Sequence, residues 1–461
     1  MLELIEPHLG GGATAIADRE GELSYRDLDR RGAGLARVLL DAGLRPDEPV
    51  VIHAHPSRWA VIGMLAVLRA GGRYVAIDAA FPFQRQQDVA RACGARIALI
   101  EPDMIVPLTG PAHRVDMART DLPGGPVPAT SARLAYTCFT SGSTGAPKPV
   151  TVSRAALSWS TSARLAHYAS PVTGFLLCSS ISFDSSVAGI YWTLACGGTL
   201  VIPSQRPSDL AAAARFAAEH RPSHLLMVPS LYGLALRNGL AEAFGSLGTV
   251  IVAGETCPPA LVGEHYAALP GAVLHNEYGP TECTVWSTVH RCVPEDARAA
   301  RVPIGRPIPG ARVSVADPGP DGVGELVISG PGLAEGIGDA YRTGDLVSRR
   351  PDGELLFHGR ADHQLKLGGA RMERAEIEHA MAGFPGVTAA AVGVSRAGSG
   401  PARLKGYLVT DQDRIDRRAL RAHLLDRLPI VAVPTVFQRL DSLPLLPNGK
   451  VDYNSLDGVS P

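Results

Sequence analysis

A short run of hydroxyl, glycine and lysine residues, Thr140 to Lys148, is the stretch of this sequence best suited to bind an anion. It reads TSGSTGAPK and follows an apolar run, residues 132–139, that is typical of a buried strand. Glycine lets successive backbone N–H groups approach an anion, and hydroxyls with an ammonium group complete a cradle for phosphate. Pro147 lies where a Walker loop requires glycine. The pattern therefore predicts a phosphate-binding loop of another kind, with a Gly/Ser-rich surface turn as the alternative.

Lysine is rare in this chain, because only four of the 44 basic residues are lysine. Lys148 closes the loop, Lys366 precedes two glycines, and Lys450 ends the turn Pro-Asn-Gly-Lys. Lysine is a compact point charge on a flexible stem, which arginine does not imitate. These three lysines are therefore candidates for chemistry, and a chance distribution is the alternative.

Length and composition limit the class of protein. A chain of 461 residues exceeds what one core usually supports, so two or more domains are expected. The net charge of −1 argues against nucleic acid or a membrane as partner, and no stretch approaches the roughly 20 apolar residues of a membrane span. Residues 1–12 do not resemble a signal peptide. The seven cysteines show no CxxC spacing, so we expect a cytoplasmic protein without disulfides or zinc.

Predicted strands and helices alternate through the first part of the chain, which indicates a largely parallel sheet with helices on its faces. Ser24 and Ser153 stand at the start of two of the helices as N-caps. The predicted helices are 24–43, 58–70, 83–93, 154–168, 185–195, 210–219, 230–237 and 259–269, and the predicted strands are 50–54, 74–77, 96–100, 132–139, 150–152, 176–179, 199–202, 224–228, 249–252 and 273–276.

A boundary is predicted near Gly359-Arg360-Ala361-Asp362. The chain after it contains short strands, two helices and the lysine turn, and forms a unit of about 100 residues, a normal domain size. We therefore expect an α/β protein with an N-terminal domain of residues 1–360 and an α+β C-terminal domain of residues 361–461.

With these segments in order, the chain resembles the adenylate-forming superfamily, which includes acyl- and aryl-CoA ligases and luciferase. It is most similar to the amino-acid-activating adenylation domains of nonribosomal peptide synthetases. Ten motifs in sequence order carry the resemblance: 23–28 (LSYRDL), 68–78, 139–148, 183–186 (FDSS), 276–282 (NEYGPTE), 324–326, 341–346 (YRTGDL), 359–378, 428–434 and 448–452 (NGKVD). The resemblance also implies a small β-barrel-like portion in the large domain and a mobile C-terminal domain.

The resemblance implies that ATP and Mg²⁺ are used to join a carboxylate to the α-phosphate and release pyrophosphate. Glu282 would hold Mg²⁺, Tyr278 would stack on adenine, Asp345 would accept the ribose hydroxyls, Arg360 would lie near the ribose, and Lys450 would bridge substrate carboxylate and nucleotide. The implied nucleotide-binding set is Thr140, Ser141, Gly142, Ser143, Thr144, Gly145, Lys148, Asn276, Tyr278, Gly279, Thr281, Asp345 and Arg360, and the implied catalytic set is Lys450, Glu282, Thr140 and Lys148.

Asp184 matches the aspartate that pairs with the α-ammonium group of an amino acid, and its alternative role is that of a helix N-cap. The implied side-chain pocket consists of Ser185, Ala188, Met227, Ile251, Ala253, Glu277, Val285 and Trp286, with Lys450 at the carboxylate.

Two pocket positions suggest a substrate. Trp286 is bulky and should shorten the pocket, and Glu277 places a carboxylate in an otherwise apolar space, where it requires a cation. We expect a short basic amino acid, such as 2,3-diaminopropionate or 2,4-diaminobutyrate. In the alternative, Glu277 points at a neighbouring Arg or His or accepts a hydroxyl, and the substrate is a small neutral amino acid such as serine or alanine.

In this family the C-terminal domain rotates between two half-reactions, and Asp362 matches the hinge. Lys366 and the two glycines at 368–369 would then admit the phosphopantetheine thiol of a carrier protein, supplied in trans or by a longer chain. A small MbtH-like accessory protein is a further candidate partner. Pro149, Gly368 and a short segment at 336–341 depart from the family pattern. The competing interpretations are a CoA ligase and a non-catalytic binding protein of the same fold.

Overall fold

The structure is a computed structural model of the chain. It describes residues 1–104, 108–119, 122, 127–140, 147–361, 364–367, 370–395, 403–410, 412, 415–444 and 451–456. The chain divides into two compact units, which are described separately: Met1–Ala80, Ala90–Phe139 and Pro149–Ala361 form the first, and Phe81–Val89, Thr140–Lys148 and Asp362–Pro461 form the second.

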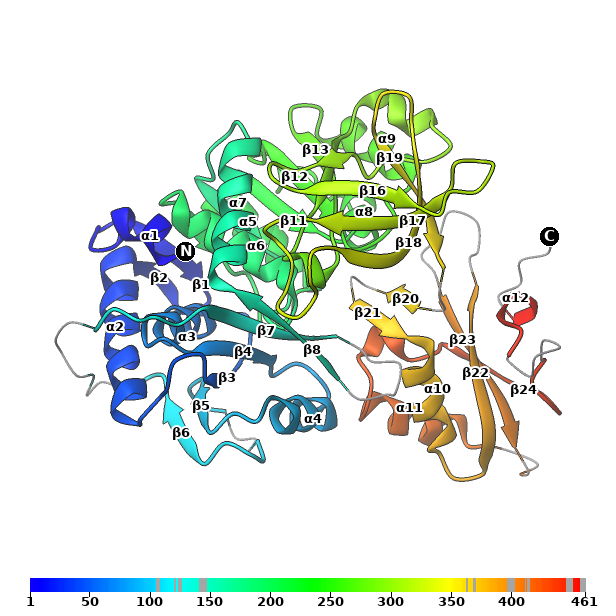
Figure 1. Ribbon diagram of the computed structural model, residues 1–461, viewed down its shortest axis with the longest axis horizontal. Helices are drawn as coiled ribbons and strands as arrows, with labels where there is room; N and C mark the ends of the chain where they lie inside the picture. Colours follow the sequence, from blue (N-terminus) through cyan, green and yellow to red (C-terminus); the bar gives the residue numbers. More distant parts are fainter. Residues whose placement is uncertain are drawn as a thin grey trace. The chain divides into compact units, whose positions relative to one another are not determined.

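A nine-stranded sheet is the largest element of the first unit, with the order β15-β14-β13-β12-β11-β9-β10-β1-β2 (Figure 1). Strands β1, β10, β9, β11, β12 and β13 are parallel to their neighbours, whereas β2, β14 and β15 pair in the antiparallel sense. Its strands are β1 (Thr14–Asp18), β2 (Gly21–Ser24), β9 (Gly174–Leu177), β10 (Thr199–Val201), β11 (His224–Met227), β12 (Thr249–Ala253), β13 (Val273–Tyr278), β14 (Thr288–Arg291) and β15 (Arg306–Pro307).

A six-stranded sheet, in blue to teal in Figure 1, has the order β6-β5-β3-β4-β7-β8. Two of its connections, from β3 to β4 and from β4 to β5, contain a helix, as expected of crossovers between parallel strands. The strands are β3 (Pro49–Ala54), β4 (Arg73–Asp78), β5 (Ile97–Ile100), β6 (His113–Asp116), β7 (Leu134–Thr140) and β8 (Lys148–Ser153).

The helices between these strands begin where the sequence supplies caps. The hydroxyl oxygens of Ser24 and Ser153 accept from the backbone N–H of Asp27 and Ala156, respectively, so both predicted N-caps are confirmed. The helices are α1 (Leu2–Ile5), α2 (Tyr25–Asp41), α3 (Arg58–Arg69), α4 (Phe83–Cys93), α5 (Arg154–His167), α6 (Asp184–Ala195), α7 (Leu210–His220), α8 (Pro229–Arg237) and α9 (Pro259–Ala268), with short 3-10 turns η1 (Glu6–His8), η2 (Thr281–Cys283) and η3 (Pro294–Arg298).

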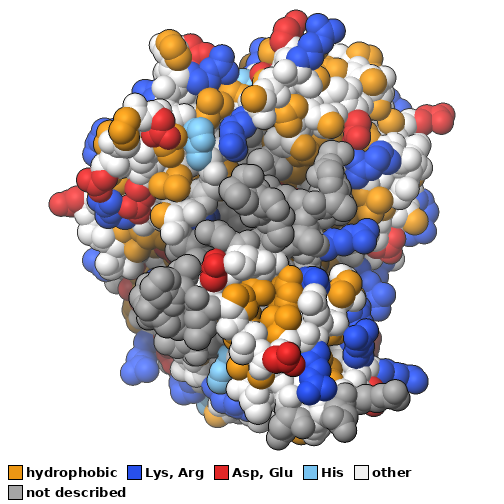
Figure 2. Space-filling view, turned by 90° about the vertical axis from the view of Figure 1, so that its right-hand side faces the viewer, with side chains coloured by type: hydrophobic (Ala, Val, Ile, Leu, Met, Phe, Trp, Pro, Cys, Tyr) orange, Lys and Arg blue, Asp and Glu red, His pale blue; other side chains and the backbone are white. Residues whose placement is uncertain are grey.

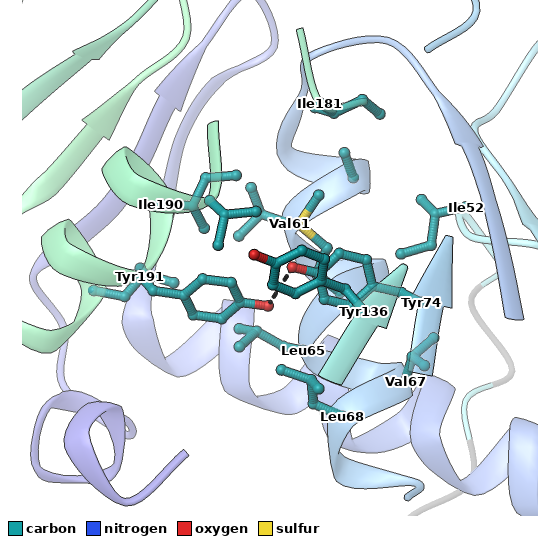
Figure 3. Close-up of a cluster of buried hydrophobic side chains, with 14 of the residues drawn as sticks. Ile52, Val61, Leu65, Val67, Leu68, Tyr74, Tyr136, Ile181, Ile190 and Tyr191 are labelled. Carbon is teal, nitrogen blue, oxygen red and sulfur yellow. Dashed lines mark hydrogen bonds between the residues drawn. The ribbon is translucent and has the colours of Figure 1, made fainter. Parts of the chain in front are cut away.

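Three buried tyrosines join the six-stranded sheet to α6 (Figure 3). The rings of Tyr74 on β4 and Tyr136 on β7 stack with centroids 5.5 Å apart, and the Tyr191 hydroxyl on α6 donates to the Tyr74 hydroxyl at 3.3 Å. Leu65 of α3 belongs to the same core. Because this packing holds α6 along its length, it fixes the helix whose first residue is Asp184.

A four-stranded antiparallel sheet, β16-β17-β18-β19, completes the first unit. Its apolar face includes Leu326, Val347 and Leu355, and Tyr278 and Cys283 pack into the same core. The sheet therefore lies directly against the end of β13. Its strands are β16 (Arg312–Ala316), β17 (Gly324–Ser329), β18 (Tyr341–Arg349) and β19 (Leu355–Arg360).

The second unit contains a two-stranded hairpin and a three-stranded sheet, in which β22 and β23 are antiparallel and β23 and β24 are parallel. Helix α10 packs on the sheet through Ile377 and Met381. The elements are β20 (Gln364–Leu367), β21 (Ala370–Glu373), α10 (Arg374–Ala382), β22 (Val387–Ser395), β23 (Arg403–Thr410), α11 (Arg417–Leu425), η4 (Ile430–Ala432), β24 (Val436–Arg439) and α12 (Tyr453–Leu456).

On the face drawn in Figure 2, basic and acidic side chains are interspersed rather than gathered by sign. This agrees with the near-zero net charge. Within the described part of the chain, none of the helices combines the length and apolar character needed to cross a bilayer.

Candidate active site

The carboxyl ends of three parallel strands, β11, β12 and β13, lie side by side in the nine-stranded sheet. Met227 is in register with Val252, and Ala253 is in register with Glu277. The carboxyl ends of parallel strands are the usual location of a ligand site in an open α/β sheet. The first turn of α6 and the turn η2 supply the remaining candidate side chains.

Asp184 has one carboxylate oxygen, Oδ2, that is buried and has no hydrogen-bond partner among the described residues. Burial raises the pKa of this carboxyl to about 6, although a hydrogen bond from the Thr281 side chain lowers it, and the nearby negative charge of Glu282 adds to the rise. The N-cap of α6 is Phe183, with no side-chain cap bond, so the interpretation of Asp184 as a helix cap is wrong. A buried carboxylate with an unused oxygen is suited to bind a cation.

Glu282 lies in η2 and is buried, and its negative charge raises the pKa of Asp184. Two carboxylates this near to each other favour the binding of a positive ion between or beside them. Carboxylate oxygen is the ligand that Mg²⁺ prefers. The residues present therefore fit the metal predicted at Glu282.

Tyr278, Asp345 and Arg360 are brought together by two adjacent strands and the end of β13. Asp345 and Arg360 are cross-strand partners on β18 and β19, and Arg360 Nη1 donates to Asp345 Oδ1 at 2.7 Å. The Tyr278 hydroxyl donates to Asp345 Oδ2, and burial together with the Asp345 charge raises the pKa of Tyr278. Tyr278 and Arg360 therefore hold the Asp345 carboxylate in a fixed orientation.

Residues before and after Tyr278 in the chain are fixed by contacts within the protein. The Asn276 amide donates to the Pro303 carbonyl at 2.7 Å, so this predicted nucleotide-binding side chain is already bonded within the protein. A Cβ atom at Gly279 would lie 2.4 Å from Trp286 Cα. Only glycine permits this close approach.

The turn after η2 is strained. Thr284 and Val285 have φ values of 56° and 78°, which are unfavourable for β-branched residues. The Thr284 hydroxyl donates to the Gly332 carbonyl at 2.6 Å, and the Ser160 hydroxyl donates to the Thr284 carbonyl at 3.0 Å. These hydrogen bonds stabilise the strained backbone conformation. Backbone strain of this kind is concentrated at functional sites. The turn presents Val285 and Trp286 to the candidate pocket.

Glu277 already has a positively charged partner within the protein, because Arg164 of α5 pairs with it. Arg164 Nη1 and Nη2 donate to the two carboxylate oxygens at 2.6 and 2.8 Å, and the Tyr168 hydroxyl donates to one of them. The two charged side chains are 1% and 2% exposed. Burial opposes the charge on Arg164, but the partner carboxylate and Tyr168 raise its pKa overall. The premise that Glu277 lacks a cation within the protein is therefore wrong, and the alternative of a neighbouring arginine is confirmed.

Aromatic rings enclose this ion pair. The Arg164 guanidinium lies 4.3 Å from the centre of the Trp286 ring and 5.5 Å from that of Trp192. Tyr168 stacks on Trp286 with centroids 5.9 Å apart. Trp286 is fully buried and its Nε1 donates to the Ser160 carbonyl at 3.3 Å. Cation–π contacts stabilise a desolvated guanidinium further.

The register of β11 separates two of the predicted pocket residues. Leu226, not Met227, pairs with Ile251, so Leu226 and Ile251 share a face of the sheet. Leu226, Ile251, Ala188 and Trp286 belong to one apolar cluster, whereas Met227 belongs to the cluster on the opposite face. A shift of one residue in a strand reverses its side chains. Met227 and Ile251, both predicted pocket residues, therefore lie on opposite faces of the sheet.

The remaining predicted residues are less well placed. Ser185, a predicted pocket residue, lies in the first turn of α6. At the two ends of the predicted phosphate loop, Thr140 Oγ1 lies 3.5 Å from the Lys148 carbonyl oxygen, and Lys148 is exposed. The positions outside the described residues are Ser141, Gly142, Ser143, Thr144, Gly145, Asp362, Gly368, Gly369 and Lys450, together with the Lys366 side chain.

The sequence matches the family described as AMP-binding enzyme over residues 8–337. Phosphinothricin tripeptide synthetase PhsC of Streptomyces viridochromogenes is 36% identical over 486 residues, which cover 96% of this chain and 43% of that protein. Novobiocin biosynthesis protein H of Streptomyces niveus is 35% identical over 491 residues, with 96% and 79% covered. Bacitracin synthase 3 of Bacillus licheniformis is 36% identical over 480 residues, with 96% and 7% covered. The chain thus spans less than half of two of these relatives.

Solved structures share the fold. Holo-PA1221, an NRPS protein containing adenylation and PCP domains bound to a vinylsulfonamide inhibitor, has a TM-score of 0.84 and 26% identity, with 99% of this chain and 83% of that chain covered. The amide bond synthetase McbA from Marinactinospora thermotolerans has a TM-score of 0.87 at 23% identity, with 98% of each chain covered, and shows the fold alone. The predicted α/β fold is confirmed.

The raised pKa of Asp184 generates a test, since only the ionised carboxylate attracts an ammonium group. We expect kcat/KM for an amino acid substrate to fall about tenfold per pH unit below an inflection near pH 6, because protonation neutralises Asp184 in the free enzyme. Asp184→Asn should remove this inflection and lower kcat/KM by about 100-fold at neutral pH. An acid inflection near pH 6 that persisted in Asp184→Asn would assign it to another group.

Proposed function

This chain belongs to the family of AMP-binding enzymes, and from that premise we propose that it activates an amino acid as the aminoacyl adenylate and passes it to the phosphopantetheine thiol of a carrier protein. The observation that carries the proposal is the buried, unpartnered Oδ2 of Asp184 at the carboxyl edge of the large sheet. A simple fatty or aromatic acid has no group to neutralise this oxygen. The α-ammonium group of an amino acid does.

The nucleotide site is proposed at Tyr278, Asp345 and Arg360. The three side chains form one bonded set, which supports a role in holding adenine and ribose. Arg360 donates to Asp345, and a charge-assisted hydrogen bond of this kind fixes the carboxylate in an orientation suited to accept from the ribose hydroxyls. The loop from Thr140 to Lys148 is proposed to hold the β- and γ-phosphates.

In the proposed first step, a substrate carboxylate oxygen attacks the α-phosphorus of ATP. The bond between this phosphorus and the oxygen bridging to the β-phosphate breaks, and pyrophosphate leaves. Both reactants are anions, so positioning and charge neutralisation supply most of the acceleration. Asp184 fixes the ammonium end of the substrate, and Lys450 is proposed to bridge the carboxylate and the α-phosphate. Mg²⁺, when held by Glu282, neutralises the phosphate charge.

In the proposed second step, a thiol attacks the acyl carbon and AMP leaves. The support for a carrier protein as the thiol donor comes from a similar protein, since holo-PA1221 contains adenylation and PCP domains. The large synthetases among the relatives are consistent with the same interpretation. Asp362 is the proposed hinge for exchanging Lys450 with Lys366.

ATP–pyrophosphate exchange with a panel of amino acids tests the first step. We expect exchange that depends on one amino acid and Mg²⁺, and a loss of at least about 100-fold in Lys450→Ala, because no other cation is proposed at the reacting oxygens. Lys405→Ala, which removes another of the four lysines, should leave exchange unchanged.

Acyl transfer distinguishes the competing functions. Product on a phosphopantetheinylated carrier supports the proposal, whereas a free acyl-CoA product would identify a CoA ligase. The absence of any nucleotide-dependent pyrophosphate release would identify a non-catalytic binding protein.

The Arg164–Glu277 pair favours a small, uncharged side chain in the substrate. A second cation beside Glu277 would face the guanidinium of Arg164 in a buried space, which is unfavourable. Trp286, held over the same guanidinium, limits the depth of the pocket. The proposed substrate is therefore an amino acid of serine or alanine size, and the diamino acids are no longer favoured.

Removing Arg164 should reverse this preference. In Arg164→Met the Glu277 carboxylate keeps only the Tyr168 donor, so we expect kcat/KM for 2,4-diaminobutyrate to rise at least about tenfold while that for the neutral substrate falls. In Arg164→Met/Glu277→Gln, which has no buried charge, the gain for the diamino acid should vanish.

Arg58→Met is the matched control, because it breaks another buried arginine–carboxylate pair, with Asp18. Thermal unfolding of each variant shows that it is folded. An unchanged order of substrates in folded Arg164→Met would contradict the role of the pair, while the exchange reaction itself would still stand.

A further inference from the structure

The segment that carries Lys450 is bonded to the second unit on both of its sides. Residues 445–450 lie outside the described part of the chain, whereas Pro444 before them and residues 451–456 after them are described. The backbone N–H of Asp452 donates to the Pro444 carbonyl at 2.8 Å. The loop that contains Lys450 is therefore closed at its base by a backbone hydrogen bond.

The short helix α12, which begins three residues after Lys450, packs closely against β22 and β23. Leu456 at its end shares an apolar cluster with Ala391 of β22 and Tyr407 of β23. The Tyr407 hydroxyl donates to the Leu456 carbonyl at 2.8 Å. A Cβ atom at Gly393 of β22 would lie 2.8 Å from the Leu456 carbonyl oxygen, so glycine permits this close approach. The end of α12 is thus fixed by apolar and polar contacts.

The start of α12 is fixed by Tyr453, which contacts two side chains of α10. The Tyr453 hydroxyl donates to Glu378 Oε2 at 3.0 Å. The Arg374 guanidinium lies 4.6 Å from the centre of the Tyr453 ring. The ring is therefore held by a cation on its face and by a carboxylate at its hydroxyl. We call Arg374, Glu378 and Tyr453 the tyrosine anchor.

The two α10 side chains of the anchor are themselves fixed by β22. Glu378 Oε1 accepts from the Val392 N–H at 2.9 Å, and Arg374 Nη1 donates to the Val392 carbonyl at 2.8 Å. Strand β22 is the outer strand of its sheet, so backbone groups on its open side need partners other than a strand. Because one strand residue fixes both side chains, α10, β22 and α12 form a single bonded set.

We propose that the tyrosine anchor positions Lys450 for the first step, so that Tyr453 and Glu378 are positioning residues of the adenylation reaction. The inference rests on the role proposed above for Lys450. A lysine carries its charge on a flexible stem, and the location of the ammonium group therefore depends on how firmly the adjacent backbone is held. A misplacement of about 1 Å can cost about 100-fold in rate.

Tyr453→Phe tests the anchor, because it removes one hydroxyl and keeps the ring beside Arg374. We expect kcat for ATP–pyrophosphate exchange to fall at least about tenfold, because the ammonium group of Lys450 is less often in position. KM for ATP and for the amino acid should change by less than about twofold, since no group that binds either reactant is removed. Glu378→Gln, which keeps an oxygen for the Val392 N–H, should lower kcat in the same way.

The second step distinguishes positioning from a general loss of structure. Transfer of preformed aminoacyl adenylate to a phosphopantetheine thiol should keep its native rate in Tyr453→Phe, because Lys450 is proposed to act only in the first step. A merely structural defect would lower the rates of both steps together. A parallel loss in the two steps would therefore overturn the proposal.

Two hydroxyl deletions outside the anchor serve as matched controls. The Tyr266 hydroxyl donates to the Cys292 carbonyl and the Thr410 hydroxyl to the Gly386 carbonyl, each at 2.6 Å. Tyr266→Phe in the first unit and Thr410→Val in the second should keep the native kcat and the native ratio of the two steps. Thermal unfolding identifies the folded variants, and if Tyr453→Phe does not fold, Glu378→Gln decides.

A double-mutant cycle tests whether Tyr453 acts through Lys450. In the Lys450→Ala background, Tyr453→Phe should cause no further loss of exchange, because the group that it positions is absent. Equal losses in the two backgrounds would overturn the proposal, as would a native kcat in both Tyr453→Phe and Glu378→Gln. Full exchange in Lys450→Ala itself would contradict the proposed function as well, whereas the other results contradict the anchor alone.

Discussion

A carboxylate cannot be buried without a positive charge or hydrogen-bond donors to compensate it, and the candidate site is arranged around this constraint. Glu277 is compensated within the protein by Arg164, and Asp345 is compensated by Arg360. Asp184 has one oxygen without a partner among the described residues, and burial raises its pKa to about 6. The protein thus supplies its own cations at the proposed nucleotide site and pocket wall, and among the described residues of the candidate site Asp184 is the carboxylate proposed to receive a cation from the ligand.

Much of the fold could be predicted because local signals agreed with the final structure. Ser24 and Ser153 cap helices at the predicted positions, and α4 has the predicted bounds, Phe83–Cys93. The two outermost strands on each side of the nine-stranded sheet, β1 and β2 on one side and β14 and β15 on the other, were not predicted. They are short, and pairing with distant strands, rather than their own pattern, defines them. Strand β18 alternates more buried and less buried residues. It was not predicted as a strand, because its sequence was interpreted only as a functional motif.

The site was predicted less completely, because charges and registers are settled between distant segments. Sequence motifs located Asp184 and Glu277 but could not show that Arg164, 113 residues from Glu277, neutralises it. That Met227 and Ile251 lie on opposite faces of the sheet depends on strand register, in which a single position decides the face.

The central claim is that the unpartnered oxygen of Asp184 selects an ammonium group. The most direct test compares the exchange reaction of the preferred amino acid with that of its des-amino counterpart, the same acid with hydrogen in place of the α-amino group. The account predicts that kcat/KM is at least about 100-fold lower for the des-amino acid, as for the loss of one member of a buried ion pair. Equal values for the two acids in the native enzyme would contradict it.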